Sequence, residues 1–182
     1  MGKEKYKKDI LALFEKSPVV SIDSIDRIIK SKKNVKSYVK RAINYLIKQG
    51  KIKRITRGYY TVLDNASLAV FCFKPAYLGL QDALSFHNLW EQETIPVIVT
   101  SKNIRTGIRN ILGSNVLIKR IEKKYLFGID YYQENNYALP YSDIEKTFID
   151  MVYFRQPLDK EVIKEIKRRL DKKKLKSYLR VY

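Results

Sequence analysis

Apolar residues in the first 64 positions recur every three to four residues, a spacing that predicts three consecutive helices. The apolar face of the first helix contains Tyr6, Ile10, Leu13 and Phe14. Pro18 ends this helix, and Ser21 is a suitable cap for the second. The buried side of the second helix is expected to contain Ile22, Ile25, Ile28 and Ile29. After a short polar turn over 31–34, a third helix is predicted from about Val35 to Gln49, with Gly50 as a left-handed C-terminal cap.

The third predicted helix has two clearly different faces when its residues are placed 100° apart. Its apolar stripe contains Val35, Val39, Ala42, Ile43 and Leu46. The opposite arc contains Lys36, Ser37, Lys40, Arg41, Asn44 and Lys48, with no acidic residue. A solvated helix face normally mixes charge signs, because opposite charges one turn apart stabilise the helix slightly. An arc of this kind indicates that phosphates supply the missing negative charge, and its Ser, Asn and Arg side chains can donate to base edges.

A basic hairpin is predicted directly after this helix, in the segment Lys51–Leu63. Ile52 and Ile55 flank an expected basic tip at Lys53-Arg54, and Arg57-Gly58 can turn the chain into a second strand. Three helices followed by a hairpin are typical of a winged helix-turn-helix. Such a helix fits the major groove of DNA, whereas the deep, narrow groove of RNA excludes it. The predicted DNA-contacting residues are Lys33, Asn34, Lys36, Ser37, Lys40, Arg41, Asn44, Lys48, Lys53, Arg54 and Arg57.

The distribution of charge supports a polyanionic partner. The chain of 182 residues has a net charge of +18. Residues 1–64 hold 17 Lys and Arg against 6 Asp and Glu, residues 65–154 hold 9 of each, and residues 155–182 hold 11 against 4. A lysine-rich proteome could raise the total, but would not by itself leave the middle neutral. The cluster at 172–174 is either a second phosphate contact or a solvated helix end.

The remaining two thirds of the chain predict a second, α/β domain over 65–182, so the whole is expected to be α+β: a winged helix over 1–64, then a small mixed sheet with C-terminal helices. Residues 64–73 fit a buried helix or a strand. A short helix is expected over 81–89, burying Ala83, Leu84 and Phe86, and strands over 96–100, 115–121, 124–132 and 137–139. Ser142 and Glu145 form a capping-box pattern before a helix whose inner face would contain Ile144, Phe148, Ile149 and Val152. Two further helices are expected after Pro157.

Several segments together resemble the AbiEi-type antitoxins of type IV toxin–antitoxin systems. They are Arg57-Gly58-Tyr59-Tyr60, the run from Pro75 to Leu84, Val97-Ile98-Val99-Thr100, Phe127-Gly128, and the run from Asp143 to Asp150. The resemblance implies a repressor that binds double-stranded DNA at its own promoter. It also implies a neighbouring nucleotidyltransferase-like toxin, which the antitoxin opposes without forming a stable complex. His87-Asn88-Leu89 departs from the His-Gly-Leu expected of the family. The alternative is a winged-helix regulator whose second domain senses something else.

No enzymatic pattern is well developed, so the sequence predicts neither catalysis nor a metal or other cofactor. His87 is the only histidine and lies among core-like residues, which argues against a Ser/His/Asp triad. The nearest catalytic alternative is a metal-dependent nuclease using Glu122-Lys123-Lys124, on a predicted strand, with the acids of 143–146. The single cysteine, Cys72, is expected to be a buried, inert thiol. Without a leader-like or membrane-spanning apolar run, we expect a cytoplasmic protein with no membrane partner.

Overall fold

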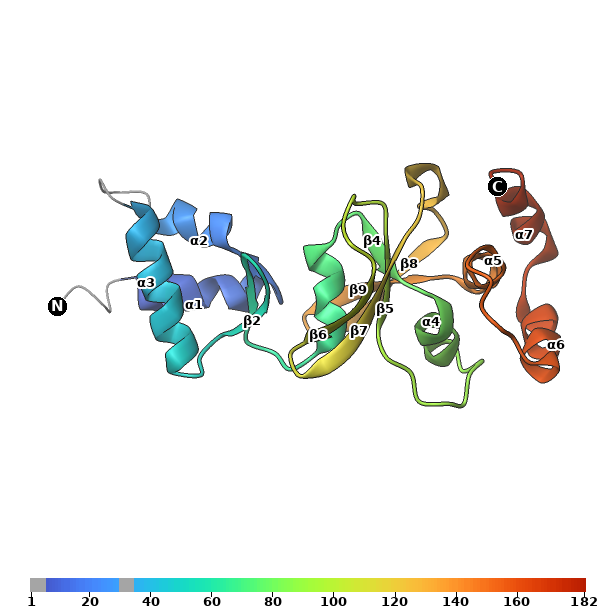
Figure 1. The fold of residues 1–182 in the computed structure, drawn as a ribbon, viewed down its shortest axis with the longest axis horizontal. Coiled ribbons are helices and arrows are strands. Elements are labelled where there is room, and N and C mark those ends of the chain that lie inside the picture. Colours follow the sequence, from blue (N-terminus) through green and yellow to red (C-terminus); the bar gives the residue numbers. More distant parts are fainter. Residues whose placement is uncertain (1–5, 30–34) are drawn as a thin grey trace.

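The computed structural model describes residues 6–29 and 35–182 and confirms the predicted α+β class. The molecule is elongated: a helical N-terminal unit lies at one end, a six-stranded sheet in the middle and three helices at the other end (Figure 1). The described residues contain no helix that is long and apolar enough to cross a membrane.

The N-terminal unit comprises residues 6–29 and 35–63. Its elements are α1 (Lys7–Lys16), β1 (Val20–Ser21), α2 (Ile22–Ile29), α3 (Val35–Lys48), β2 (Lys53–Thr56) and β3 (Tyr59–Thr61). The three short strands form an antiparallel sheet in the order β1-β3-β2. The Ser21 hydroxyl accepts a hydrogen bond from the Ser24 backbone at 3.1 Å, and Gly50 has a φ of 65°, so both predicted helix caps are confirmed. The core of the unit contains Ile10, Phe14, Val20, Ile25, Ile29, Val39, Ile43, Leu46, Ile52 and Tyr60.

The hairpin differs from its prediction. Lys53 and Arg54 are not at its tip but begin β2, and the turn consists of Arg57 and Gly58. Gly58 has a φ of 81°, a backbone conformation that favours glycine and places the turn at this position. Ile55 is buried against the middle of the molecule, which further fixes the register of β2.

The central sheet is mixed and has the strand order β6-β7-β5-β4-β9-β8. Its strands are β4 (Ala76–Leu78), β5 (Val97–Thr100), β6 (Gly107–Ile111), β7 (Ser114–Arg120), β8 (Ile129–Glu134) and β9 (Tyr137–Ser142). The pairs β4–β9 and β5–β7 are parallel, and the remaining pairs are antiparallel. The short strands β4 and β6 were not predicted. The segment predicted as a strand from Lys124 instead starts with a 3₁₀ turn, η2 (Lys123–Tyr125).

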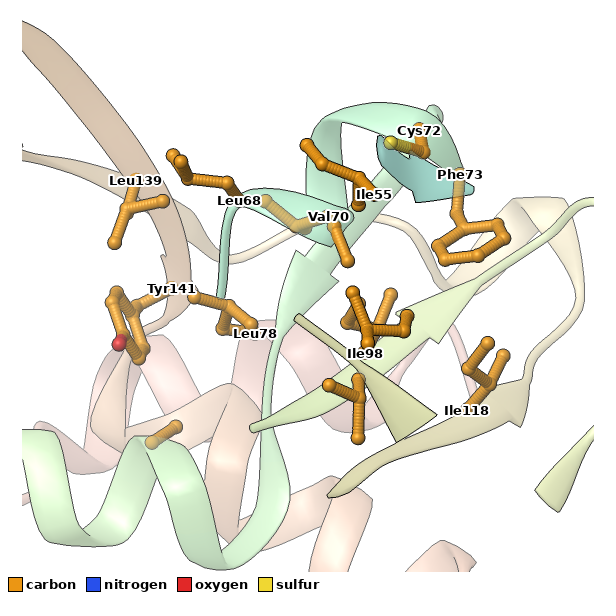
Figure 2. Packing of buried hydrophobic residues seen from close by; sticks show 14 residues of the cluster. Ile55, Leu68, Val70, Cys72, Phe73, Leu78, Ile98, Ile118, Leu139 and Tyr141 are labelled. Carbon is orange, nitrogen blue, oxygen red and sulfur yellow. The ribbon is translucent and has the colours of Figure 1, made fainter. Parts of the chain in front are cut away.

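One side of the sheet packs against η1 (Ala66–Cys72), a 3₁₀ helix that resolves the choice between helix and strand for this segment. Asn65 caps it by accepting a hydrogen bond from the Ser67 backbone at 2.9 Å. Figure 2 shows Val70 of η1 between the strand residue Ile98 and Ile55 of the N-terminal hairpin. The hairpin and the sheet therefore share one hydrophobic core.

The N-terminal unit is joined to the sheet at this shared core. Tyr59 and Leu63 also pack against it, and the Asn65 amide donates to Glu134 at 3.2 Å. The boundary predicted after residue 64 lies in the irregular segment between β3 and η1. The segment that connects β3 to η1 is therefore short, and the residues before and after it pack into the same core.

Helices cover the other side and the far end of the sheet: α4 (Leu80–Phe86), α5 (Ile144–Tyr153), α6 (Lys160–Arg169) and α7 (Lys172–Leu179). Phe86 was expected to be buried but is 40% exposed, because its ring stacks on the outside against Tyr141. Asp143, not Ser142, caps α5, accepting from the Lys146 backbone at 2.7 Å.

The inner face of α5 also differs from its prediction. Val152 is 62% exposed, whereas Lys146, Thr147 and Asp150 are completely buried. The helix turns this polar side inward because tyrosine hydroxyls and neighbouring polar groups satisfy it there. Of the predicted inner face, Ile149 is buried and Ile144 and Phe148 pack partly buried against the core, so the prediction was wrong only for Val152 and missed the buried polar residues.

Candidate nucleic-acid interface

The exposed face of α3 is the first candidate site. Val39, Ile43 and Leu46 are buried in the core of the N-terminal unit, and this anchors one side of the helix. The opposite side carries four exposed residues: Lys40, Arg41, Asn44 and Lys48. No acidic residue occurs in the first turn of the helix. The face therefore presents cations and an amide to solvent, a combination suited to phosphate oxygens and base edges.

Four other predicted residues are Lys33, Asn34, Lys36 and Ser37. Lys36 and Ser37 belong to the first turn of α3. Lys33 and Asn34 lie outside the described residues.

The three predicted hairpin cations are in different situations. Lys53 forms an ion pair with Asp64, so its charge is already partly compensated within the chain. Arg54 is exposed and its Nε donates to the Thr56 carbonyl at 3.3 Å. Arg57 is exposed at the turn. In Figure 1, α3 lies toward the outer end of the molecule and β2 lies toward the sheet. The structure thus groups the α3 residues on one face, whereas Lys53 lies in β2 and is ion-paired with Asp64.

A second polar cluster lies at the opposite end of the molecule and was not predicted. Lys146 and Asp150 of α5 form a fully buried ion pair. The Tyr77 hydroxyl donates to Asp150 Oδ2 at 2.5 Å, and the Tyr182 hydroxyl donates to Asp150 Oδ1 at 2.8 Å. Lys146 Nζ also donates to the Tyr182 hydroxyl at 2.6 Å. The rings of Tyr77, Phe127 and Tyr182 surround the ammonium, each centroid 5.3 Å from Nζ.

Burial dominates the electrostatics of this pair. Desolvation lowers the pKa of Lys146, and the charge of Asp150 opposes the decrease. Desolvation likewise raises the pKa of Asp150, with Lys146 acting in the opposite direction. The pKa of the Tyr77 hydroxyl is raised well above its ordinary value by burial and by Asp150. Each group therefore depends on the others for its hydrogen bonds, and solvent has no access to the charged atoms of the pair.

A half-exposed layer closes this cluster. Lys174 Nζ lies 3.0 Å from Asp143 Oδ2, and the Tyr178 hydroxyl donates to the same oxygen at 2.8 Å. Burial alone would lower the pKa of Lys174, but Asp143 raises it above its ordinary value. Gly128 makes the close packing possible, because a Cβ there would lie 2.9 Å from the Tyr178 ring and 2.8 Å from the Lys146 side chain.

The residues considered for catalysis are placed elsewhere. His87 Nε2 donates to the Ser142 carbonyl at 2.7 Å. Glu122, expected on a strand, instead precedes η2 and pairs with Lys124 at 3.2 Å. Burial raises the pKa of the Cys72 thiol to about 12, which Lys102 partly opposes. Among the described residues, no group of three or more His, Cys, Asp or Glu could hold a metal ion.

Sequence reasoning missed the Lys146–Asp150 cluster for a physical reason. Charged residues four positions apart on a helix usually form a solvated pair, and nothing local distinguishes this one. The signal was the pattern of neighbours: a Phe-Gly step at 127–128 and tyrosines at 178 and 182, four residues apart.

A scan against models of known protein families finds no match to this sequence, and a search of curated proteins finds no relative.

Proposed function

We propose that the chain is a sequence-specific DNA-binding transcription regulator whose N-terminal unit acts as a winged helix. The observation that carries the proposal is the acid-free, exposed face of α3 with Lys40, Arg41, Asn44 and Lys48. The element order α1-β1-α2-α3-β2-β3 supports it, since a helix-turn-helix followed by a hairpin presents its last helix to the major groove. The excess of positive charge in residues 1–64 adds a sequence-independent attraction to the DNA backbone.

The α3 residues are expected to divide their roles. Arg41 and Asn44 can each form two hydrogen bonds with a base edge, Arg with guanine and Asn with adenine, so we assign them to sequence recognition. Lys40 and Lys48 are single flexible charges, which suits phosphate contacts.

Binding of a selected DNA site and of a random duplex tests this division. Arg41→Ala and Asn44→Ala should each weaken binding to the selected site by about 1–3 kcal/mol. Asn44→Ala should leave binding to the random duplex nearly unchanged, because it removes no charge. Lys40→Ala should weaken both complexes alike. Lys123→Ala, an exposed lysine in η2, is the matched control and should change neither. Equal losses for Asn44→Ala on both duplexes would disprove its role in recognition.

We further propose, from the family resemblance, that the regulated promoter is the chain's own and that the sheet and C-terminal helices oppose a neighbouring nucleotidyltransferase-like toxin. A full-length Arg41→Ala/Asn44→Ala variant should lose repression and still protect cells from that toxin. The full-length variant is preferable to a deletion, because removing residues 1–63 would uncover the core shared with the hairpin. If the variant loses repression but the wild type itself gives no protection from the toxin, a regulator with an unrelated sensing domain becomes the better proposal.

A further inference from the structure

A cleft of about 300 Å³ lies where the N-terminal unit meets the sheet, the two neighbouring parts of the molecule in Figure 1. The N-terminal unit contributes the turn between α1 and β1, the first turn of α2 and one residue of β3. The other side contributes the end of η1, the loop after it and the start of β9. Small-molecule sites occur preferentially at such junctions, and the volume is at the lower end of their range.

The polar groups of this junction cleft suit an anion. Among the described residues, no Asp or Glu lines the cleft, and none forms an ion pair with the exposed Lys74. The Lys74 ammonium lies 4.9 Å from the centroid of the Phe71 ring, so a cation and an aromatic surface are adjacent. The hydroxyl oxygens of Ser21 and Ser24 lie 3.0 Å apart and share a hydrogen bond. That bond uses only one of their two hydroxyl protons, which leaves the other for an acceptor in the cleft.

Three aromatic side chains form much of the apolar lining: Tyr59 of β3, Phe71 of η1 and Tyr137 of β9. Rings from three elements therefore converge on the cleft, and aromatic rings bind planar groups by stacking and edge contacts. Glu134 lies close to the Tyr137 hydroxyl but is already engaged, because it accepts a hydrogen bond from the Asn65 amide at 3.2 Å. The lining as a whole thus combines a planar apolar surface with positive charge.

We propose that the junction cleft binds a small molecule that consists of a planar aromatic group carrying an anionic group. The Lys74 ammonium and the remaining hydroxyl proton of the Ser21–Ser24 pair hold the anion through charge-assisted hydrogen bonds. The three rings hold the planar part. Aromatic carboxylates and nucleoside monophosphates are the two sources of this chemistry. Because the lining comes from both parts of the molecule, the bound ligand contacts the N-terminal unit and the sheet together.

Calorimetric titration of the full-length chain with benzoate and, separately, with adenosine monophosphate tests the proposal. At least one of the two should bind with a Kd at or below about 1 mM. Its neutral counterpart, benzamide or adenosine, should bind about tenfold more weakly, because the charge-assisted hydrogen bonds are lost. Inorganic phosphate has the charge but no ring and should bind about tenfold more weakly as well, which separates the site from a general attraction of anions to a chain of net charge +18. Binding of benzoate alone would assign the site to carboxylates, and binding of adenosine monophosphate alone to nucleotides.

Variants of the full-length chain locate the binding. Lys74→Gln should weaken it about tenfold, and Lys123→Gln, at an exposed lysine far from the cleft, is the matched control that should leave it unchanged. Ala138→Leu keeps the charge but fills part of the cleft, so it should abolish binding. Circular dichroism verifies that each variant is folded. In NMR titrations, the ligand should shift the amide signals of Ser24, Phe71 and Ala138.

The titrations contain no DNA, so their outcome is independent of the proposed DNA binding. The proposal is overturned if neither probe binds, or if the neutral counterpart or inorganic phosphate binds as tightly as the probe. It is also overturned if Lys74→Gln behaves like Lys123→Gln, if Ala138→Leu binds normally, or if the NMR shifts are confined to α3.

Discussion

The steepness with which salt weakens DNA binding can be estimated from the exposed cations of the proposed interface. The described candidates for phosphate contacts on α3 and the hairpin are Lys40, Lys48, Arg54 and Arg57. Lys53 is left out of this count, because Asp64 already partly compensates its charge. If each of these four cations neutralises one phosphate, log K against log[salt] has a slope of about −3.6. Raising salt from roughly 50 to 200 mM should therefore lower affinity by about 150-fold.

Fluorescence anisotropy with a labelled random duplex measures this slope without knowledge of the operator. Replacing Lys40 and Lys48 together by Gln should make the slope shallower by about 2, because two counterions fewer are released. The same replacement at Lys123 should leave it unchanged. A wild-type slope shallower than about −2 would mean that the α3 face does not contact the DNA backbone.

Two further predictions concern stability. Burial raises the pKa of Asp82 to about 7, although a hydrogen bond from the Val97 backbone opposes the increase. Between about pH 4 and pH 7 the folded state therefore holds a proton that the unfolded chain releases. The free energy of unfolding should fall as pH rises through this range, by up to about 4 kcal/mol. Urea unfolding should show that Asp82→Asn removes this loss, and a parallel pH profile for variant and wild type would contradict it. Lys146→Met should lower the free energy of unfolding by about 3–5 kcal/mol, because it leaves the buried Asp150 without its ion-pair partner. Adding Asp150→Asn should restore at least half of this loss, since the amide oxygen can still accept a hydrogen bond from a tyrosine hydroxyl. Simple additivity of the two single changes would refute coupling in the pair.

The features that could be predicted from the sequence are those with a long, regular signal. The α3 helix has an apolar stripe over four turns and a glycine at its end, and both its rotation and its cap were predicted correctly. The short strands β4 and β6 could not be found in this way, because three to five residues with little alternation carry almost no periodic information. Their place in the sheet depends on partners distant in sequence.

The candidate sites show the same division. Exposure of Lys40 and Arg41 follows from helix geometry. The ion pair between Lys53 and Asp64 depends instead on the path of the chain after β3, which the local sequence does not determine. Burial of the Lys146–Asp150 pair could not be inferred locally. Lys146 is hydrogen-bonded to Tyr182, 36 positions later, and Asp150 to Tyr77 of β4, far earlier in the chain.

The hydrophobic core that the hairpin shares with η1 also determines how this protein can be dissected. Cutting the chain after residue 63 would expose Ile55, Tyr59 and Leu63 together on one side of a small unit. Such a patch makes an isolated fragment poorly soluble and prone to self-association, whatever its intrinsic affinity for DNA. A useful short fragment would carry polar replacements at Ile55 and Leu63, and a chimera with another regulatory domain would have to recreate the surface of η1 as well as the linker.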